Sequence, residues 1–373
     1  MRAGCLGGCG LPDGREAALL KIRVAFVIMN ADYFGPVARP DENVEQLARE
    51  RQAQLTKPAG SLGRLEELGI WISACQGECP PRELQDCRVV VFAGDHGIAQ
   101  HGVSAFPAEV SIQMLANIQM KGAGVNALAE VAGASVSVVD ISLDHDADGP
   151  YRVRRSCGSI DREDSMSEEE VARAIRAGIA IADKAVDEGA DLLIAGDLGI
   201  GNTTPAAAMI GAVTNSEPVV VVGRGTGIDD NGWKIKVAAV RDAMFRVRRL
   251  RNDPVEVLRR ISSPDLAAMA AFLAQAAVRR TPVILDGVVV TSAALLADQL
   301  APGARDWWVA GHKSAEPAHE IALRHLDKQP LLEYGMRLGE GSGAVASLPL
   351  VKHGVSILRN MATFADAGVS NKD

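Results

Sequence analysis

The chain has 373 residues, enough for one large domain or two ordinary ones with a substantial buried core. Apolar residues make up 47 % of it and charged residues 23 %, a composition that excludes wholesale disorder. With 39 Lys and Arg against 47 Asp and Glu the net charge is −8, which argues against nucleic acid or an anionic membrane as the main partner. The 37 glycines follow no Gly-X-Y period, which excludes collagen and indicates the tight turns that ligand loops use.

Residues 1–40 carry little information about the fold. The apolar stretch from Ala17 to Met29 is interrupted by Lys21 and Arg23, is too short to span a bilayer and lacks a small-residue cleavage site. We expect a poorly ordered extension here, with the folded protein starting near Asp41.

The six cysteines are too few for a disulfide framework in a chain of this length. Cys75, Cys79 and Cys87 are close in sequence, but no His or second Cys pair flanks them at zinc-finger spacing. We expect ordinary reduced thiols in a cytoplasmic protein, and no metal site.

The predicted elements begin with a helical pattern over 42–76 that is broken at 57–61, with Ser61 as the N-cap of the second helix. After Pro80 and Pro81, short β-branched runs recur, each followed by a small or polar cluster. The predicted strands are 89–93, 135–141, 192–195, 219–222, 283–285 and 308–310.

One helix between these strands has clear boundaries, because Ser167 and Glu170 form a capping box and Gly189 follows the last turn of an apolar stripe. Apolar strands separated by helices indicate a parallel sheet with helices on both faces. Ligands of such sheets bind beyond the carboxyl ends of the strands, so the residues after each predicted strand are candidates for a site.

The richest candidate follows the strand at 192–195. A Gly-rich turn, a hydroxyl pair and a helix start come in succession, which is the arrangement that cradles a phosphate with backbone N–H groups and a helix dipole. It is neither a Walker A loop nor a dinucleotide fingerprint, and an ordinary tight turn with a Thr cap stays open. The candidate residues are Asp197, Gly199, Ile200, Gly201, Asn202, Thr203 and Thr204.

A second Gly/Thr turn, 223–227, follows the predicted strand 219–222. Arg224 and Lys236 stand near it in sequence and could complete an anion site. Asp229 and Asp230 come after the turn, where a cap for the next helix is the simpler interpretation.

The first predicted strand is followed by Asp95, His96 and His101, which could suggest a metal site. No other His stands at usable spacing. The Gly, Ser, Phe and Pro that come next, including Ser104 and Phe106, better suit the wall of a pocket for an aromatic ligand.

Near the C-terminus, Glu340 stands between Gly339 and Gly341. A substrate can approach such a carboxylate closely, and apolar walls would raise its pKa toward the range of a general base. An exposed Glu at a helix start is an equally good interpretation of these residues alone.

Together these motifs resemble the nicotinate-nucleotide–dimethylbenzimidazole phosphoribosyltransferase family, which makes the lower ligand of cobalamin. The resemblance covers about 41–361, and several such motifs together are highly specific. The matching stretches, in the family's order, are KPAGSLGRLE (57–66), AGDHGIAQHGVSAFP (93–107), GDLGIGNTTP (196–205), GRGTGIDDNGWKIK (223–236), LDG (285–287), HKSAE (312–316) and RLGEGSGA (337–344).

The resemblance implies a cytoplasmic homodimer with a Rossmann-like parallel-sheet domain, flanked by helices, and a smaller helical domain from both chain ends. On this basis we expect a helical segment of the small domain over 41–85, the α/β domain over 86–330, and a C-terminal segment over 331–373 that returns to the small domain and carries the Glu340 loop. It also implies transfer of phosphoribose from nicotinate mononucleotide to a benzimidazole nitrogen, with no cofactor.

The family's residue roles carry over to matching positions. Glu340 corresponds to the general base, the turn 199–204 to the holder of the 5′-phosphate, and Lys236 and Ser314 to parts of the nucleotide site. Ser104, Phe106 and Gln113 would line the base pocket. The family usually has Glu where this chain has Asp197, a side chain about 1.5 Å shorter, so we expect altered base preference or weaker positioning at that position.

Three alternatives stay open at this stage. The same fold could ribosylate another acceptor, such as adenine or a phenol. A metal-dependent hydrolase could use Asp95, His96 and His101. A non-catalytic module could sense nicotinate mononucleotide, although the Glu340 motif argues against it.

Overall fold

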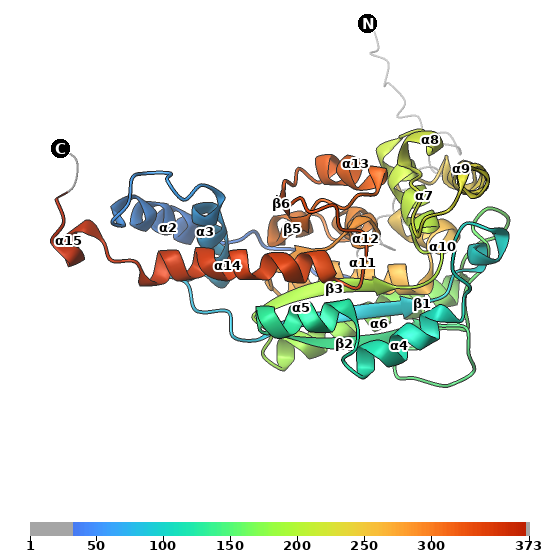
Figure 1. Cartoon of the computed structure of the whole chain (residues 1–373), viewed down its shortest axis with the longest axis horizontal. Coiled ribbons are helices and arrows are strands. Elements are labelled where there is room, and N and C mark those ends of the chain that lie inside the picture. The colour runs from blue at the N-terminus through green and yellow to red at the C-terminus, as the bar shows by residue number, and fades with distance from the viewer. Residues whose placement is uncertain (1–32, 371–373) are drawn as a thin grey trace, which may run out of the picture.

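The computed structural model describes residues 33–370 and is built around one six-stranded sheet (Figure 1). All neighbouring strands run parallel, which confirms the predicted fold class, and their order is β2-β1-β3-β4-β5-β6. The strands are β1 (Cys87–Gly94), β2 (Ala134–Ser142), β3 (Leu192–Leu198), β4 (Val283–Leu285), β5 (Trp308–His312) and β6 (Pro330–Leu332).

The strand order reverses at β1, because the chain first places β2 on one side of it and then β3 on the other. At such a switch point the loops after the two central strands diverge to opposite faces and leave a crevice. The sheet topology therefore puts the residues after β1 and β3 side by side at the carboxyl edge.

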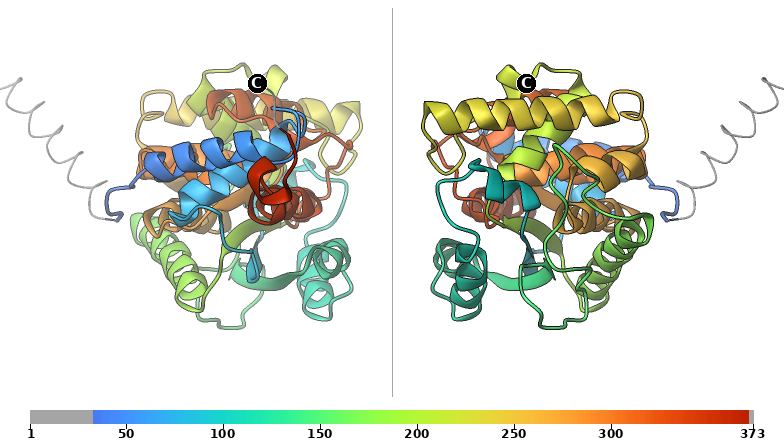
Figure 2. Two further views of the ribbon diagram at one scale, coloured as in Figure 1. Left: turned by 90° about the vertical axis from the view of Figure 1, so that its left-hand side faces the viewer. Right: turned by 90° about the vertical axis from the view of Figure 1, so that its right-hand side faces the viewer.

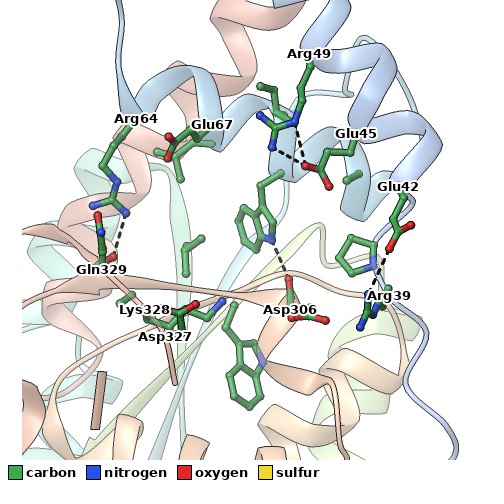
Figure 3. Close-up of a pocket in the computed structure, with 18 residues that line it drawn as sticks. Arg39, Glu42, Glu45, Arg49, Arg64, Glu67, Asp306, Asp327, Lys328 and Gln329 are labelled. Carbon is green, nitrogen blue, oxygen red and sulfur yellow. Dashed lines mark hydrogen bonds and ion pairs between the residues drawn. The ribbon is translucent and has the colours of Figure 1, made fainter. Parts of the chain in front are cut away.

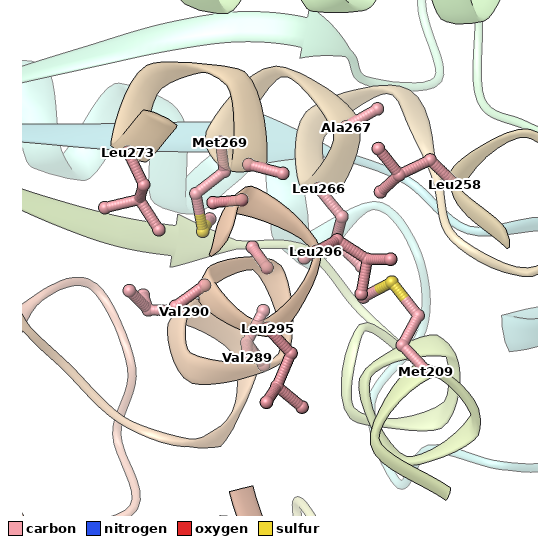
Figure 4. Close-up of a cluster of buried hydrophobic side chains, with 14 of the residues drawn as sticks. Met209, Leu258, Leu266, Ala267, Met269, Leu273, Val289, Val290, Leu295 and Leu296 are labelled. Carbon is pink, nitrogen blue, oxygen red and sulfur yellow. The ribbon is translucent and has the colours of Figure 1, made fainter. Parts of the chain in front are cut away.

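One face of the sheet is covered by α6 (Glu168–Asp187), α11 (Pro264–Val278) and α12 (Val288–Leu300). Side chains are buried along α11 from Pro264 to Ala277, because this helix is enclosed by the sheet, α6 and α12. Figure 4 shows Met269 and Leu273 of α11 pointing toward α12, and Leu266 of α11 beside Leu296 of α12. A helix that is apolar on every side can be stable only in such a position.

The other face carries α4 (Val110–Gln119), α5 (Gly124–Ala132) and α14 (Ser342–Asn360). Figure 2 shows α6 on one side of the sheet and α4 and α5 on the other. Around the carboxyl edge lie η1 (Gly97–His101), α7 (Thr203–Thr214), α8 (Pro218–Val221), α9 (Asp230–Val247), α10 (Pro254–Ile261) and α13 (Pro317–His325), and η2 (Ala304–Trp307) precedes β5.

Helices from both ends of the chain pack together, as predicted. α2 (Glu42–Gln54) and α3 (Arg64–Gln76) lie beside α14, which ends before the short α15 (Phe364–Ala367) (Figure 1). The backbones of α3 and α14 touch at Gly69 and Gly354, where a Cβ on Gly69 would stand 2.4 Å from the Gly354 carbonyl oxygen. Small residues at this crossing permit the close approach.

Several local predictions hold. The Ser167–Glu170 capping box is present at the start of α6, and Asp229 caps α9 by accepting from the Gly232 N–H at 2.8 Å. Ser61 is wrong as an N-cap, because α3 starts later and its N-cap is Gly63.

The predicted strand 219–222 is also wrong, because these residues form most of the short helix α8. Pro218 sits at the first turn of that helix, where its fixed φ and missing N–H are tolerated, and the side chains of Val219 and Val220 are half exposed. The strand β6, which the sequence did not predict, pairs with the edge strand β5 instead.

Residues 33–40 contain no helix or strand and lie against the core, with Tyr33, Phe34 and Val37 packed on it. The Trp307 indole N–H donates to the Ala38 carbonyl at 2.7 Å. The rest of the predicted extension, 1–32, lies outside the described residues. Within the described part of the chain, no helix is long and apolar enough to cross a membrane.

Candidate active site

A cavity of about 580 Å³ opens at the carboxyl edge of the sheet. Its walls come from the segments after β1, β3, β4 and β5, together with the residues just before α14. Eight of the thirteen predicted site residues line it: Phe106, Asp197, Gly199, Ile200, Asn202, Thr203, Ser314 and Glu340. We call it the edge cavity.

A larger cavity, of about 700 Å³, lies at the opposite end of the sheet between α2, α3 and the starts of β5 and β6 (Figure 3). Its charged side chains pair locally: Arg49 with Glu45 at 2.6 Å, and Arg64 with the Pro330 carbonyl at 2.6 Å. None of the predicted site residues lines it. We call it the amino-end cavity.

The turn after β3 presents a helix N-terminus to the edge cavity, because α7 begins at Thr203 with Asn202 as its N-cap. Within residues 33–370, the N–H groups of Gly201 and Thr203 donate to no protein acceptor. Free N–H groups and the positive end of the helix dipole are the features that bind a phosphate.

The turn can lie so close to β1 only because Gly199 lacks a side chain. A Cβ at this position would stand 2.0 Å from the Gly94 carbonyl oxygen and 2.9 Å from His96 Nε2. The loop after β1 therefore supports the turn from behind.

Lys236, on α9, supplies a positive charge behind the turn. Its ammonium group is fully buried and donates to the Thr203 hydroxyl at 2.7 Å. Burial lowers the pKa of Lys236 to about 8, although the Glu316 carboxylate acts in the opposite direction. Thr204 is fully buried, and neither it nor Gly201 is among the residues that line the cavity.

Glu340 reaches the cavity from a strained backbone. Its φ of 62° is left-handed, which L-residues with side chains rarely adopt, and Gly339 and Gly341 on either side are left-handed as well. The backbone N–H of Glu340 donates to the Asp197 carbonyl at 3.1 Å. Three successive left-handed residues turn the carboxylate inward just before α14 begins.

Glu340 is only 4 % exposed, and its Oε2 accepts from the Val125 N–H of α5 at 3.3 Å. Burial raises the pKa of Glu340, and the nearby Asp286 adds to this, while the Val125 hydrogen bond opposes it. A raised pKa is what a carboxylate needs to take a proton near neutral pH.

Asp197 is the last residue but one of β3, and its carboxylate accepts from the Asn202 amide at 2.7 Å. Burial raises its pKa to about 8, with Asp286 adding to the shift. A Cβ on Gly339 would come within 2.9 Å of the Asp197 carboxylate, so the two segments are in direct contact. Asp197 therefore links the phosphate turn to the Glu340 loop.

The predicted base wall is formed only in part. Phe106 lines the cavity and is half exposed. Ser104 does not line it, but its hydroxyl lies 3.3 Å from that of Thr226, which does. Gln113 is exposed on α4 and stands outside the lining.

Sequence reasoning missed several apolar residues of the wall, among them Val110 and Met114 of α4. The available signal was the spacing: Val110 and Met114 are four residues apart and therefore lie on one helix face, and Phe106 stands four residues before Val110. It also missed Glu316, which lines the cavity and accepts from the Gly225 N–H at 2.9 Å, so that it anchors the second Gly/Thr turn.

The alternative metal site gains no support. The Asp95 carboxylate already accepts from the Ser111 hydroxyl and the Asp144 N–H, at 2.5 and 2.8 Å. His96 is buried beside Asp265; burial lowers its pKa, but Asp265, Cys157 and Asp95 together raise it to about 9, which disfavours the neutral form that binds metals. Among residues 33–370, no group of three or more His, Cys, Asp or Glu is arranged to hold an ion.

The geometry agrees with comparisons to known proteins. A family model described as phosphoribosyltransferase matches residues 37–369. The chain belongs to this family. The nicotinate-nucleotide–dimethylbenzimidazole phosphoribosyltransferase of Corynebacterium efficiens is 65 % identical over 347 residues, which cover 93 % of this chain and 94 % of the relative. That of Mycolicibacterium paratuberculosis is 59 % identical over 342 residues, covering 91 % and 98 %.

Solved structures are similar to this chain over most of its length. The crystal structure of the Thermus thermophilus enzyme of the same name is 40 % identical with a TM-score of 0.83, covering 89 % of this chain and 100 % of that one. A second structure from this organism, named CobT, is 41 % identical with a TM-score of 0.85, covering 88 % and 100 %. The fold and the family are thus shown by sequence and structure together.

Proposed function

We propose that this phosphoribosyltransferase moves the 5-phosphoribosyl group of nicotinate mononucleotide to a ring nitrogen of a benzimidazole. The products are α-ribazole 5′-phosphate and nicotinate, and the reaction serves the synthesis of the cobalamin lower ligand. Relatives above 55 % identity that carry this enzyme name support it. The observation that carries the proposal is the buried Glu340 carboxylate, with its raised pKa, in one cavity with a free helix N-terminus.

The reaction needs one proton acceptor and little else. One benzimidazole nitrogen attacks C1′ of the ribose, and the bond from C1′ to the pyridinium nitrogen breaks with its electrons going to that nitrogen. The leaving nicotinate thereby loses its ring charge and needs no general acid. Glu340 takes the proton from the other benzimidazole nitrogen, which neutralises the positive charge that attack creates.

The 5′-phosphate would lie against the turn 199–204, where the N–H groups of Gly201 and Thr203 are free. Lys236, bonded to the Thr203 hydroxyl, would add positive charge, and Ser314 would contribute its hydroxyl from the opposite wall. This arrangement fixes C1′ relative to Glu340, and such positioning supplies much of the rate enhancement of a transfer reaction.

The acceptor base would lie between Phe106 and the apolar residues of α4, with Thr226 as a further contact that Ser104 supports; Gln113, outside the lining, would not reach it. Asp197, in place of the family's usual Glu, would change the contacts made to the acceptor. An Asp197→Glu variant should therefore shift the preference among benzimidazole, adenine and phenolic acceptors. An unchanged ranking would contradict this role.

The deciding experiment supplies the purified protein with nicotinate mononucleotide and each acceptor in turn, and follows nicotinate release and the ribosylated product by chromatography. We expect release with benzimidazoles and retention of activity in excess chelator. Nicotinate release with adenine or phenols but not with benzimidazoles would show that the enzyme ribosylates another acceptor. No release with any acceptor would refute it.

We also propose that the protein works in the cytoplasm as a homodimer. Cys75, Cys79, Cys87 and Cys157 are free thiols, as is usual in a reducing compartment. A second copy would cover exposed apolar side chains such as Met120, at 76 % exposure, and Val131, at 86 %. Light scattering should give twice the chain mass, and a monomer would refute the dimer.

A further inference from the structure

The segment Gly94–Gly97 after β1 is not used by the proposed reaction, although it stands at the switch point of the sheet. Asp95 is 4 % exposed and lines no part of the edge cavity. Its carboxylate is nonetheless fully engaged, because Oδ1 accepts from the Ser111 hydroxyl at 2.5 Å and Oδ2 from the Asp144 N–H at 2.8 Å. A buried carboxylate held this firmly needs a structural or functional reason.

The Ser111 hydroxyl has one hydrogen and donates it to Asp95. Its oxygen then accepts from the Ile200 backbone N–H at 3.1 Å. Ser111 is fully buried on α4, whereas Ile200 lies in the phosphate turn. A continuous chain of hydrogen bonds thus joins Asp95, Ser111 and Ile200, and we call it the buried relay.

The buried relay connects the two walls that the reaction must bring together. Val110 and Met114, on either side of Ser111 in α4, face the cavity where the acceptor would lie. Ile200 belongs to the turn that would hold the 5′-phosphate of the donor. One hydroxyl, packed between the two walls, therefore sets the distance between them.

We propose that Asp95 and Ser111 are positioning residues that hold the acceptor wall of α4 in register with the phosphate turn. The inference rests on the proposed function. Attack on C1′ requires the nitrogen and carbon to be held about 3–3.5 Å apart, and a displacement of about 1 Å costs on the order of 100-fold in rate. Loss of the relay lets the two walls shift relative to each other while each keeps its own contacts with its substrate.

The test compares Ser111→Ala and Asp95→Asn with the wild-type protein. In Ser111→Ala, kcat should fall about 10- to 100-fold, while the separate dissociation constants of nicotinate mononucleotide and of benzimidazole change less than about 3-fold. In Asp95→Asn the side chain keeps one of its two acceptor oxygens, so kcat should fall less than in Ser111→Ala. The double variant should match Ser111→Ala within about 3-fold, because residues that act as one unit are not additive.

A control removes a comparable hydroxyl elsewhere. Ser73 is also fully buried, and its hydroxyl donates to the Glu78 carbonyl at 2.5 Å in the small helical region. Ser73→Ala should lose about as much thermal stability as Ser111→Ala, but its kcat should stay at the wild-type value. If Ser73→Ala and Ser111→Ala lose the same activity, or if the double variant shows the product of the two single losses, the positioning role is refuted.

A second readout does not depend on turnover. Hydrogen exchange of the peptide that contains Ile200 should become faster in Ser111→Ala and stay unchanged in Ser73→Ala, because only the former removes the acceptor of the Ile200 N–H. Unchanged exchange would refute the relay whatever the activity. Absence of turnover in the wild-type protein would refute the proposed function, and the exchange result would still decide the relay.

Discussion

The two cavities at opposite ends of the sheet are of similar size but differ in how their charged side chains are held. The amino-end cavity is the larger, at about 700 Å³ against about 580 Å³, and has more charged side chains on its walls. Its arginines are satisfied locally, by neighbouring carboxylates or by backbone carbonyls. The edge cavity has fewer charges, but two of them, Asp197 and Glu340, are buried, and a backbone hydrogen bond joins their segments.

The contrast shows that a functional site is recognised by features that are unfavourable for folding, such as backbone strain and buried ionisable groups. At the edge cavity, Glu340 has a left-handed backbone, and Asp197 and Lys236 are buried with pKa values of about 8. Strain and burial of this kind are unfavourable for folding and persist where they serve a reaction. Most charged groups on the walls of the amino-end cavity lie near solvent, as the exposed Arg39–Glu42 and Arg49–Glu45 pairs do; Lys328, whose pKa burial lowers, is the exception.

The largest expected effect follows from exchanging a carboxylate for its amide in each cavity. Glu340→Gln should lower kcat about 10²- to 10⁴-fold, the usual contribution of a general base, because an amide cannot take the proton. The binding of nicotinate mononucleotide should be retained. Glu67→Gln, in the amino-end cavity, is the matched control and should leave kcat unchanged. Near-normal turnover in Glu340→Gln would remove the main distinction between the cavities.

A matched pair of lysines gives the next effect. Burial lowers the pKa of both Lys236, behind the phosphate turn, and Lys328, in the amino-end cavity. Lys236→Met should raise the KM for the nucleotide about 10- to 100-fold, since a hydrogen bond that involves a charged group is worth about 1.5–3 kcal/mol. Lys328→Met should leave KM unchanged. Equal KM values in the two variants would show that the phosphate is held elsewhere.

The sequence predicted those parts of the fold and site that have local signals. Apolar runs with turn residues identified five of the six strands, and the capping box at Ser167 set the start of α6. The run at 219–222 failed because β propensity was overridden by Pro218 and the packing of α8 on α7 and α9. Strand β6 has three residues and exists only because β5 offers an edge to pair with.

In the site, the glycine turn and Glu340 were found because their motifs are contiguous. Gln113 was predicted as a pocket residue, but its neighbour Met114 lines the cavity instead, since successive helix residues point about 100° apart. The orientation of α4 depends on Ser111, whose partners Asp95 and Ile200 are 16 and 89 residues away. Contacts at such separations leave no periodic trace in one sequence.

A smaller effect concerns the pH dependence of stability. The pKa of Asp197 is about 8 in the folded protein against an ordinary value of 3.8, so the folded state binds its proton more tightly than the unfolded state. Stability from this group is complete below pH 3.8 and falls as the pH rises toward 8. Asp197→Asn cannot titrate, so its stability relative to wild type should increase by on the order of 1–2 kcal/mol between pH 6.5 and 8. Parallel denaturation curves across this range would contradict the raised pKa.

The smallest expected effect tests whether the amino-end cavity is only structural. The Trp71 indole N–H donates to the Asp306 carbonyl at 3.1 Å across this cavity (Figure 3). Trp71→Phe removes the donor and keeps most of the apolar contact, so chemical denaturation should show a loss of about 1 kcal/mol. Both kcat and KM should stay at wild-type values, because the lost hydrogen bond joins two residues that do not line the edge cavity. A change in either kinetic constant would mean that the two ends of the sheet are coupled, and that the amino-end cavity has a part in the reaction.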